Sequence, residues 1–416
     1  MRKNIFIGFF LILILLIGSR MSFSGNKSND NDLLYKQVEL FSDTLAVIQK
    51  EYVDQTKIKD LIYGALKGML ASLDPHSQFM DPDTYNELKV DTQGKFGGLG
   101  IEITIKDGLL TVITPIEDTP AWKAGIKAGD RIVKINDDLT RDMTLTDAVK
   151  KMRGKLAETV NLTVLRENEK KLLEFKIVRD IIKIKDIKHV QILENGIGYI
   201  RLVEFRENTL QELNNALSAL SKQKMQALIL DLRNNPGGLL DVAVKITGRF
   251  LVPNKLIAYT KGRQKDQDLE FFSDSKNTIL DLPLAILINE GSASGSEIIA
   301  GALQDYKRAI IIGTKSFGKG SVQTVIPLGD GSALRLTTSH YFTPSGKIIH
   351  GKGILPDILV QNKETQISEE DNLAKKTKKF PEADKEFDYK VDEQIMRAVN
   401  ALEVVGFYKK SRNDEK

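Results

Sequence analysis

Residues 282–313 read LPLAILINEGSASGSEIIAGALQDYKRAIIIG and contain a complete strand, helix and strand pattern. The runs LPLAILIN and AIIIG are apolar at consecutive positions, which is typical of strands that are buried on both faces. Between them, SGSEIIAGALQDY has apolar residues at helical spacing. Two such strands joined through a helix predict neighbouring parallel strands in a sheet that helices cover on both sides.

The same alternation begins about a hundred residues earlier in the chain. The segments IGYIRLVEF, NTLQELNNALSAL and ALILDLR follow one another from Ile197, and another helical pattern follows Gly238. At 416 residues, the chain is long enough for two or three domains. We therefore predict an α/β core over residues 179–362 within a multi-domain α+β protein.

Changes in hydrophobic periodicity and charge divide the rest of the chain into three further segments. Residues 25–90 contain two amphipathic helical patterns, which we interpret as a packing or dimerisation surface. Residues 91–178 hold short alternating runs such as IEITI and RIVKIN between turns, and these predict a small β-rich domain. Residues 363–416 are rich in charge and contain one helical pattern, DEQIMRAVNALEVV. We expect this last segment to pack back on the core or to help assembly.

The amino terminus has the features of an export signal. Arg2 and Lys3 precede the apolar run IFIGFFLILILLIG. Because that run is shorter than the ~20 residues of a membrane-spanning helix, a cleaved signal within residues 1–24 is favoured over a retained anchor. We expect a periplasmic protein that meets the membrane only through this signal, if the signal is retained.

Composition excludes several kinds of site. The 60 Lys and Arg residues against 56 Asp and Glu give a net charge of +4, which is too balanced to indicate nucleic-acid binding. Cysteine is absent, so there is no thiolate nucleophile or disulfide. The four histidines lack metal-ligand spacing, and the sequence predicts no metal site.

The turn after LPLAILIN carries the first candidates for chemistry. A serine at a strand-to-helix turn exposes its hydroxyl at the helix N-terminus, where backbone N–H groups favour a developing negative charge. Ser292, Ser294 and Ser296 all lie there. The alternative is that these serines only cap the helix. A second turn, in DLRNNPGGLL, has a glycine pair that can present backbone N–H donors.

A serine hydroxyl is a weak nucleophile without a base beside it. None of the histidines (His76, His189, His340 and His350) has a suitable context. A lysine can act as the base if burial lowers its pKa from ~10.4 so that it is neutral. Lys319 in KSFGKGSVQ has glycine and apolar neighbours that permit this, although an exposed loop lysine is the alternative.

The β-rich segment contains a candidate binding loop. In FGGLGIEI, residues 96–103, glycines let successive N–H groups converge into a trap for a carboxylate. This loop, with AGIKAGDRIVKIND at 124–137, resembles a PDZ domain, whose GLGF-type loop is matched by Gly98, Leu99, Gly100 and Ile101. The resemblance implies that a peptide carboxylate binds this loop, and that Val149 and Met152 help line an apolar pocket.

The serine and lysine phrases resemble the carboxyl-terminal processing peptidases, which use a Ser/Lys dyad on a crotonase-like core and carry an inserted PDZ domain. The family's interval of 25 residues between nucleophile and lysine leads from Lys319 to Ser294. The resemblance implies that Gln323 orients the lysine amine and that the oxyanion hole uses the N–H of Gly295 with that of Gly237 or Gly238. Asp305 matches an acidic position that we interpret as structural.

Gly295 stands where alanine is commoner in the family, and we expect the glycine to loosen the turn.

The resemblance predicts a periplasmic serine endopeptidase that recognises substrate C-termini and needs no metal or nucleotide. Its expected partners are proteins or peptides with exposed C-termini and a second copy of the chain, and an adaptor protein is left open. A catalytically idle PDZ scaffold is the alternative. Acyl-CoA chemistry, which also occurs on crotonase-like cores, is disfavoured by the export signal and the PDZ loop.

Overall fold

The computed structural model describes residues 27–361 and 388–414, apart from 107, 117, 142, 168, 275–277 and 280. The expected export signal and half of the charged segment after the core lie outside the described residues. Within them, none of the helices combines the length and the apolar character needed to cross a membrane. The chain divides into two compact units, Met1–Phe79 and Met80–Lys416.

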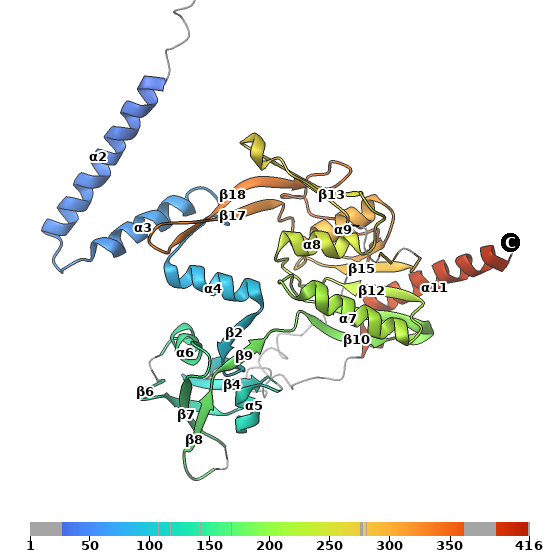
Figure 1. Ribbon diagram of the computed structural model, residues 1–416, viewed down its shortest axis with the longest axis horizontal. Helices are drawn as coiled ribbons and strands as arrows, with labels where there is room; N and C mark the ends of the chain where they lie inside the picture. Colours follow the sequence, from blue (N-terminus) through green and yellow to red (C-terminus); the bar gives the residue numbers. More distant parts are fainter. Residues whose placement is uncertain are drawn as a thin grey trace, which may run out of the picture. The chain divides into compact units, whose positions relative to one another are not determined.

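The first unit consists mainly of helices α2 (Lys27–Glu51) and α3 (Ile58–Ala71), drawn in blue in Figure 1. Many apolar side chains of α2 are exposed, among them Leu34, Val38 and Phe41. In α3, Leu70 is buried, and Tyr63 places its ring 4.8 Å from that of Phe79. The short strand β1 (Gln78–Met80) lies at the boundary between the units.

The core of the second unit is a six-stranded sheet. Its order is β10 (Ile187–Ile192), β11 (Ile197–Leu202), β12 (Ala227–Asp231), β15 (Leu284–Ile288), β16 (Ile310–Gly313) and β19 (Ile358–Leu359). All neighbouring pairs are parallel except β10 with β11. The expectation of a largely parallel α/β sheet is therefore confirmed.

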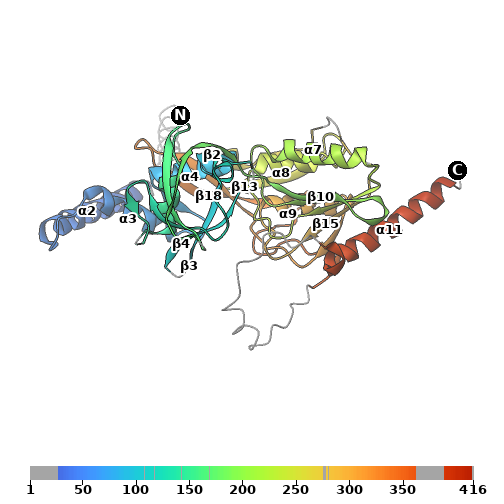
Figure 2. The same ribbon diagram turned by 90° about the horizontal axis from the view of Figure 1, so that it is seen from below.

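Helices cover both faces of this sheet, as Figure 2 shows for α7 and α8 on one side and α11 on the other. On one face, Leu228 and Leu230 of β12 share a core with α7 (Thr209–Lys222), α8 (Leu240–Gly248) and α9 (Gly295–Asp305). On the other face, Ile229 packs with Ile395 of α11 (Glu393–Asp414). The C-terminal helix is thus part of the core.

A second sheet, which the sequence did not indicate, carries the segment after Lys319. It contains β13 (Leu256–Gly262), β14 (Glu270–Phe272), β17 (Ser321–Pro327) and β18 (Ala333–Phe342), all paired antiparallel. Strand β17 begins two residues after Lys319, so pairing with β18 fixes the direction in which the lysine loop leaves the sheet.

The β-rich part has a sheet in the order β3 (Ile101–Lys106), β4 (Leu109–Pro115), β5 (Arg131–Ile135), β7 (Thr159–Leu165) and β8 (Leu173–Val178), with β6 (Asp138–Leu139) beside β5. Helices α5 (Pro120–Ala124) and α6 (Leu145–Met152) accompany it. Strand β3 is at an edge of this sheet and leaves one side open.

A two-stranded stem connects the β-rich part to the core. Helix α4 (Pro82–Gln93) leads into β2 (Lys95–Gly98), which pairs with β9 (Asp180–Lys183). The helix begins at Asp81, whose carboxylate accepts the Thr84 N–H, and ends at Gly94 with φ of 66°. Short 3-10 turns occur at Glu194–Gly196, Lys265–Gln267 and Tyr389–Val391.

Candidate active site

Ser294 lies at the turn between β15 and α9 with φ of 52° and ψ of −111°. A non-glycine residue in this region is strained, and such strain persists only where the surrounding structure enforces it. The turn places the Ser294 side chain at the N-terminus of α9, immediately before Gly295. This is the geometry of a nucleophile presented at a sharp strand-to-helix turn.

The structure distinguishes the three serines of the turn. The buried Ser292 hydroxyl donates to the Leu232 carbonyl at 2.8 Å and accepts the Asn289 N–H at 2.9 Å. The buried Ser296 hydroxyl donates to the Asn235 carbonyl at 3.0 Å. Ser294 alone among the three is partly exposed. Ser292 and Ser296 therefore brace the turn, and Ser294 is the accessible hydroxyl.

Two glycines hold the Lys319 segment in a narrow space. A Cβ on Gly320 would lie 2.2 Å from the His350 N, and one on Gly318, where φ is +94°, would lie 3.2 Å from the Gly353 N. The neighbouring backbone approaches so closely that only glycine fits without a shift. Lys319 is thus a half-buried residue in a tightly packed segment, which argues against a flexible loop lysine.

The surroundings of Lys319 favour its neutral form. Burial lowers the pKa of the amine, and the positive charge of Arg335 on β18 lowers it further, while the charge of Glu297 acts in the opposite direction. Within the described residues, no carboxylate forms an ion pair with Lys319. Arg335 was not among the residues that the sequence indicated, because its proximity depends on the β17–β18 pairing.

Glu297, also missed from the sequence, connects the serine turn to the lysine segment. It is fully buried in the first turn of α9. One carboxylate oxygen accepts the backbone N–H of Ser294 and of Lys319, each at 2.9 Å. The other accepts the Ser316 hydroxyl at 2.6 Å and the Gly318 N–H at 2.7 Å. Burial raises the pKa of this carboxyl.

The glycine pair lies against the serine turn. A Cβ on Gly237 would be 2.7 Å from the Ser294 Cβ and 3.0 Å from the Gly295 N. The Gly237 N–H is occupied, because it donates to the Asn235 side chain at 2.9 Å. The N–H groups of Gly238 and Gly295 donate to no acceptor among the described residues. These two are therefore the donors available to a developing oxyanion.

Glycine at position 295 is explained by the space around it, and not by the loosening of the turn that we expected. A Cβ at this position would lie 2.9 Å from the Phe205 ring and 3.1 Å from the Ala243 Cβ. Phe205 is buried and its backbone brackets the glycine pair, since its N–H donates to the Gly237 carbonyl and its carbonyl accepts the Leu239 N–H. The glycine thus allows close packing of the turn on Phe205.

Gln323 and Asp305 make contacts of their own. The Gln323 amide donates to the Ser321 hydroxyl at 2.8 Å, and no hydrogen bond between Gln323 and Lys319 is found in the described part of the chain. A bulge between Val322 and Gln323 shifts the register of β17 against β18. Asp305 accepts the Ser345 N–H and pairs with Lys347, which is a structural role.

The glycine loop before β3 presents unused N–H groups. Gly100 has φ of +79°, and a Cβ there would lie 2.3 Å from the Thr119 side chain, so the loop requires glycine. Among the described residues, the N–H groups of Leu99 and Gly100 donate to no backbone acceptor. The residue that follows them, Ile101, begins the edge strand β3.

Helix α6 packs beside β3 and supplies apolar side chains to this region. Val149 is partly exposed, whereas Met152 is buried in the core of the β-rich part. Leu145 precedes Val149 by four residues, lies on the same face of the helix and is 39% exposed. The accessible apolar stripe is therefore formed by Leu145 and Val149 more than by Met152.

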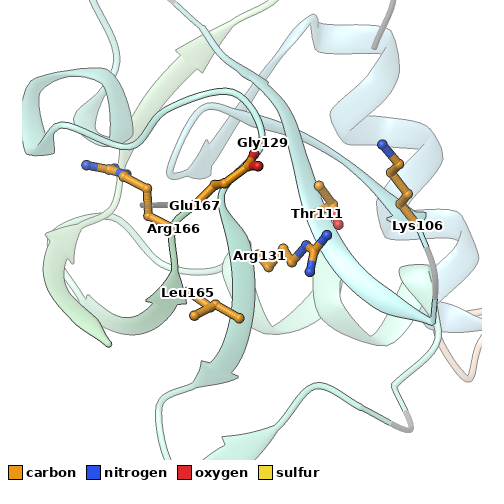
Figure 3. Close-up of a pocket in the computed structure, with 7 residues that line it drawn as sticks. All are labelled: Lys106, Thr111, Gly129, Arg131, Leu165, Arg166 and Glu167. Atoms are coloured by element: carbon orange, nitrogen blue, oxygen red, sulfur yellow. The ribbon is translucent and has the colours of Figure 1, made fainter. Parts of the chain in front are cut away.

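A pocket of about 300 Å³ in the β-rich part is separate from these residues (Figure 3). Its lining residues are Lys106, Thr111, Gly129, Arg131, Leu165, Arg166 and Glu167. Three of its charged lining residues, Lys106, Arg131 and Arg166, are cations and Glu167 is an anion, and Arg166 is paired with Asp130. In the described ranges, no three potential ligands are grouped to hold a metal ion.

Three parts of the chain match known protein families. Residues 196–360 match Peptidase family S41, residues 111–166 match the PDZ domain, and residues 18–84 match the N-terminal domain of the activating protease CtpB. A carboxy-terminal-processing protease of Bartonella bacilliformis is 46% identical over 86% of this chain and 83% of its own length. The chain belongs to peptidase family S41.

Two other known proteins are similar to this chain over most of its length. A probable CtpA-like serine protease of Staphylococcus epidermidis is 32% identical over 97% of this chain and 86% of its own length. A solved photosystem II D1 C-terminal processing protease is 30% identical, covers 80% of this chain and 95% of its own, and has a TM-score of 0.45. The family matches and the two curated relatives show that this S41 peptidase is a serine protease of the carboxy-terminal-processing type with a PDZ domain. Ser294, Lys319, Glu297 and the glycine pair all lie within the S41 match.

Proposed function

We propose that this S41 peptidase is a periplasmic endopeptidase that recognises substrate C-termini through its PDZ domain and cleaves with a Ser294/Lys319 dyad. The observation that carries the proposal is the shared anchoring of the strained Ser294 and the half-buried Lys319 on one carboxylate. A half-buried lysine that lies close to Arg335 and forms no ion pair with an acid in the described part of the chain is suited to serve as a general base.

In the proposed reaction, the neutral Lys319 amine accepts the Ser294 hydroxyl proton as the serine oxygen bonds to the scissile carbonyl carbon. The carbonyl oxygen becomes an oxyanion, which the N–H groups of Gly295 and Gly238 stabilise. The oxyanion collapses, the C–N bond breaks, and the Lys319 ammonium protonates the leaving amine. Lys319 then takes a proton from water as the water oxygen bonds to the acyl carbonyl carbon. The second oxyanion collapses, the ester C–O bond to Ser294 breaks, and the Lys319 ammonium returns the proton to the Ser294 oxygen.

The dyad is tested by alanine variants of the full chain with a peptide substrate. Ser294→Ala and Lys319→Ala are expected to lower kcat by at least ~10³-fold with unchanged thermal unfolding. Lys315→Ala is the matched control, because Lys315 is an exposed lysine of the same segment. A fluorophosphonate probe should label Ser294 in the wild type. Normal turnover by either dyad variant would contradict the assignment of the dyad. Absence of both the adduct and cleavage in the wild type would instead favour an idle scaffold.

Recognition of C-termini is supported by the unused N–H groups of Leu99 and Gly100 beside the open edge of β3. The proposal includes binding of the peptide carboxylate by these groups and by the Ile101 N–H. Amidation of a substrate C-terminus should weaken its binding to the Ser294→Ala variant by ~10-fold or more, since it removes a charged acceptor. Fluorescence anisotropy measures this, and equal affinity of acid and amide forms would overturn the assignment.

Location and assembly are also part of the proposal. The cationic and apolar start of the sequence supports export to the periplasm. The exposed apolar residues of α2 support a homo-oligomer, for which we propose a dimer. Cell fractionation and light scattering of the purified protein test these points, and a cytoplasmic protein or a monomer at micromolar concentration would contradict them. Whether an adaptor delivers substrates is tested by the activity of the purified protein alone.

A further inference from the structure

The connection through Glu297 has no role in the proton transfers described above. Its carboxylate is fully buried, yet it lies at the junction of the two segments that carry the proposed dyad. The contacts are made to the main-chain N–H groups of residues 294 and 319, so they act on the position of both residues whatever their side chains do. A helix-capping acid would contact only the first turn of its own helix.

We propose that Glu297 is a positioning residue that fixes the separation of Ser294 and Lys319 by accepting both of their backbone N–H groups on one carboxylate oxygen. This inference rests on the proposed dyad. The serine turn belongs to α9, whereas the lysine segment leads into β17. A third group must therefore hold these two elements at a fixed distance, and we assign that role to Glu297.

The four contacts match what an ionised carboxylate can accept. Two oxygens offer about four acceptor positions, and Ser294, Lys319, Ser316 and Gly318 supply four donors. The desolvation of a buried charge is therefore compensated by hydrogen bonds. A glutamine at this position has only one acceptor oxygen, and its amide N–H groups would face two donors. It would lose contacts to one side of the junction while keeping nearly the same volume.

The charge of Glu297 should also affect the pH dependence of kcat/KM, which partial unfolding of a variant would not shift. Arg335 lowers the pKa of Lys319 and Glu297 raises it. The other titratable residues of the segments packed around Lys319 include His340, the β18 residue opposite Ser321, and His350, whose backbone lies against Gly320. Lys352, whose backbone lies against Gly318, and the exposed Lys315 add positive charges there. Removing the negative charge should shift the acidic limb of the kcat/KM profile to lower pH, because the lysine then loses its proton more readily.

The experiment compares Glu297→Gln with Glu297→Asp in the full chain. Both should lower kcat by ~10²-fold, since a misplacement of about 1 Å has that cost, with KM within about threefold of wild type. Only the glutamine variant should shift the acidic limb of the kcat/KM profile, because aspartate keeps the negative charge. The aspartate side chain is shorter and should affect only the positions of the two segments. Glu290→Gln is the matched control, because Glu290 is an exposed glutamate of the same turn that contacts Thr314.

Active-site titration with a fluorophosphonate expresses kcat per folded site. A wild-type kcat in either Glu297 variant, or a loss explained fully by fewer folded sites, would overturn the inference. If the glutamine variant does not fold, the aspartate variant alone tests the inference: a kcat lowered by ~10²-fold supports it and a wild-type kcat overturns it. Ser294→Ala and Lys319→Ala are assayed in parallel. Cleavage by those two variants would refute the dyad itself, whereas their inactivity beside normal Glu297 variants would refute only the positioning role.

Discussion

Arg335 and Glu297 act on the Lys319 amine with opposite sign, and burial adds to the effect of Arg335. We predict that Arg335→Gln raises the pKa of Lys319, because a neighbouring positive charge is removed. A smaller fraction of the amine is then neutral at pH 7, so kcat/KM falls there several-fold and recovers at higher pH. The pH profile of peptide cleavage measures this.

The matched control for Arg335 is Arg263→Gln, which changes an exposed arginine. Its profile should superimpose on that of the wild type. An acidic limb that stays in place, or moves to lower pH, in Arg335→Gln would show that Arg335 does not act on the general base.

We expect a side chain at Gly238 to lower activity, unlike a side chain at an ordinary loop glycine. At Gly238, φ is +138° and a Cβ would lie 2.2 Å from the Phe205 carbonyl oxygen, so Gly238→Ala must displace the loop. We predict a loss of kcat of ~10²-fold or more, which is the usual effect of removing an oxyanion donor. Gly329→Ala, where a Cβ meets nothing within 4 Å, is the control. Steady-state kinetics of the two variants give the comparison, and equal kcat values would exclude Gly238 as a donor.

At the scale of elements, the C-terminal helix α11 contributes to the stability of the sheet. Ile395 is fully buried against the face that contains Ile229, whereas Val404 is 56% exposed. Ile395→Ala should lower the free energy of unfolding by about 2–5 kcal/mol, because it leaves a cavity in a packed core. Val404→Ala should change it by less than ~0.5 kcal/mol. Urea denaturation measures both, and equal values would mean that α11 detaches before the sheet unfolds.

The same elements show which features a sequence can and cannot reveal. Strands β12 and β15 are buried at every position because both faces are covered, and apart from Asp231 at the end of β12 they are apolar, so their pattern was recognisable. Strands β17 and β18 mix polar and apolar residues, and their pairing depends on contacts that no local pattern records. The second sheet was therefore missed, and with it the proximity of Arg335 to Lys319.

The residues of the candidate site likewise differ in whether the sequence alone could indicate them. Ser294 and Lys319 could be indicated because their phrases have a recognisable interval and chemistry. Glu297 could not, since an acid in the first turn of a helix is usually an exposed partner of the helix dipole. Its burial depends on the segment with Ser316, Gly318 and Lys319 folding back over it, about twenty residues later in the chain. The occupied Gly237 N–H likewise depends on the Asn235 side chain.

At the scale of the whole second unit, Arg206 joins helix α4, which leads into the stem of the β-rich part, to Phe205, which is hydrogen-bonded to the glycine-pair loop. Its guanidinium donates to the Asp91 carbonyl at 3.0 Å and also pairs with Asp186 and Glu204. The adjacent Phe205 forms backbone hydrogen bonds on both sides of the glycine pair. We therefore expect a displacement of helix α4 to affect the glycine pair through Arg206 and Phe205.

We predict that Arg206→Gln lowers kcat by ~10-fold or more without changing the affinity for a C-terminal peptide, because the Phe205 loop loses its anchor while the binding loop before β3 is untouched. Cleavage kinetics give kcat, and peptide anisotropy in the Ser294→Ala background gives the affinity. Lys245→Gln, which breaks an exposed pair with Asp241, is the control and should leave both values unchanged. A wild-type kcat in Arg206→Gln would mean that the glycine pair is held without the stem, and a parallel loss of affinity would mean that the substitution disturbs the β-rich part as well.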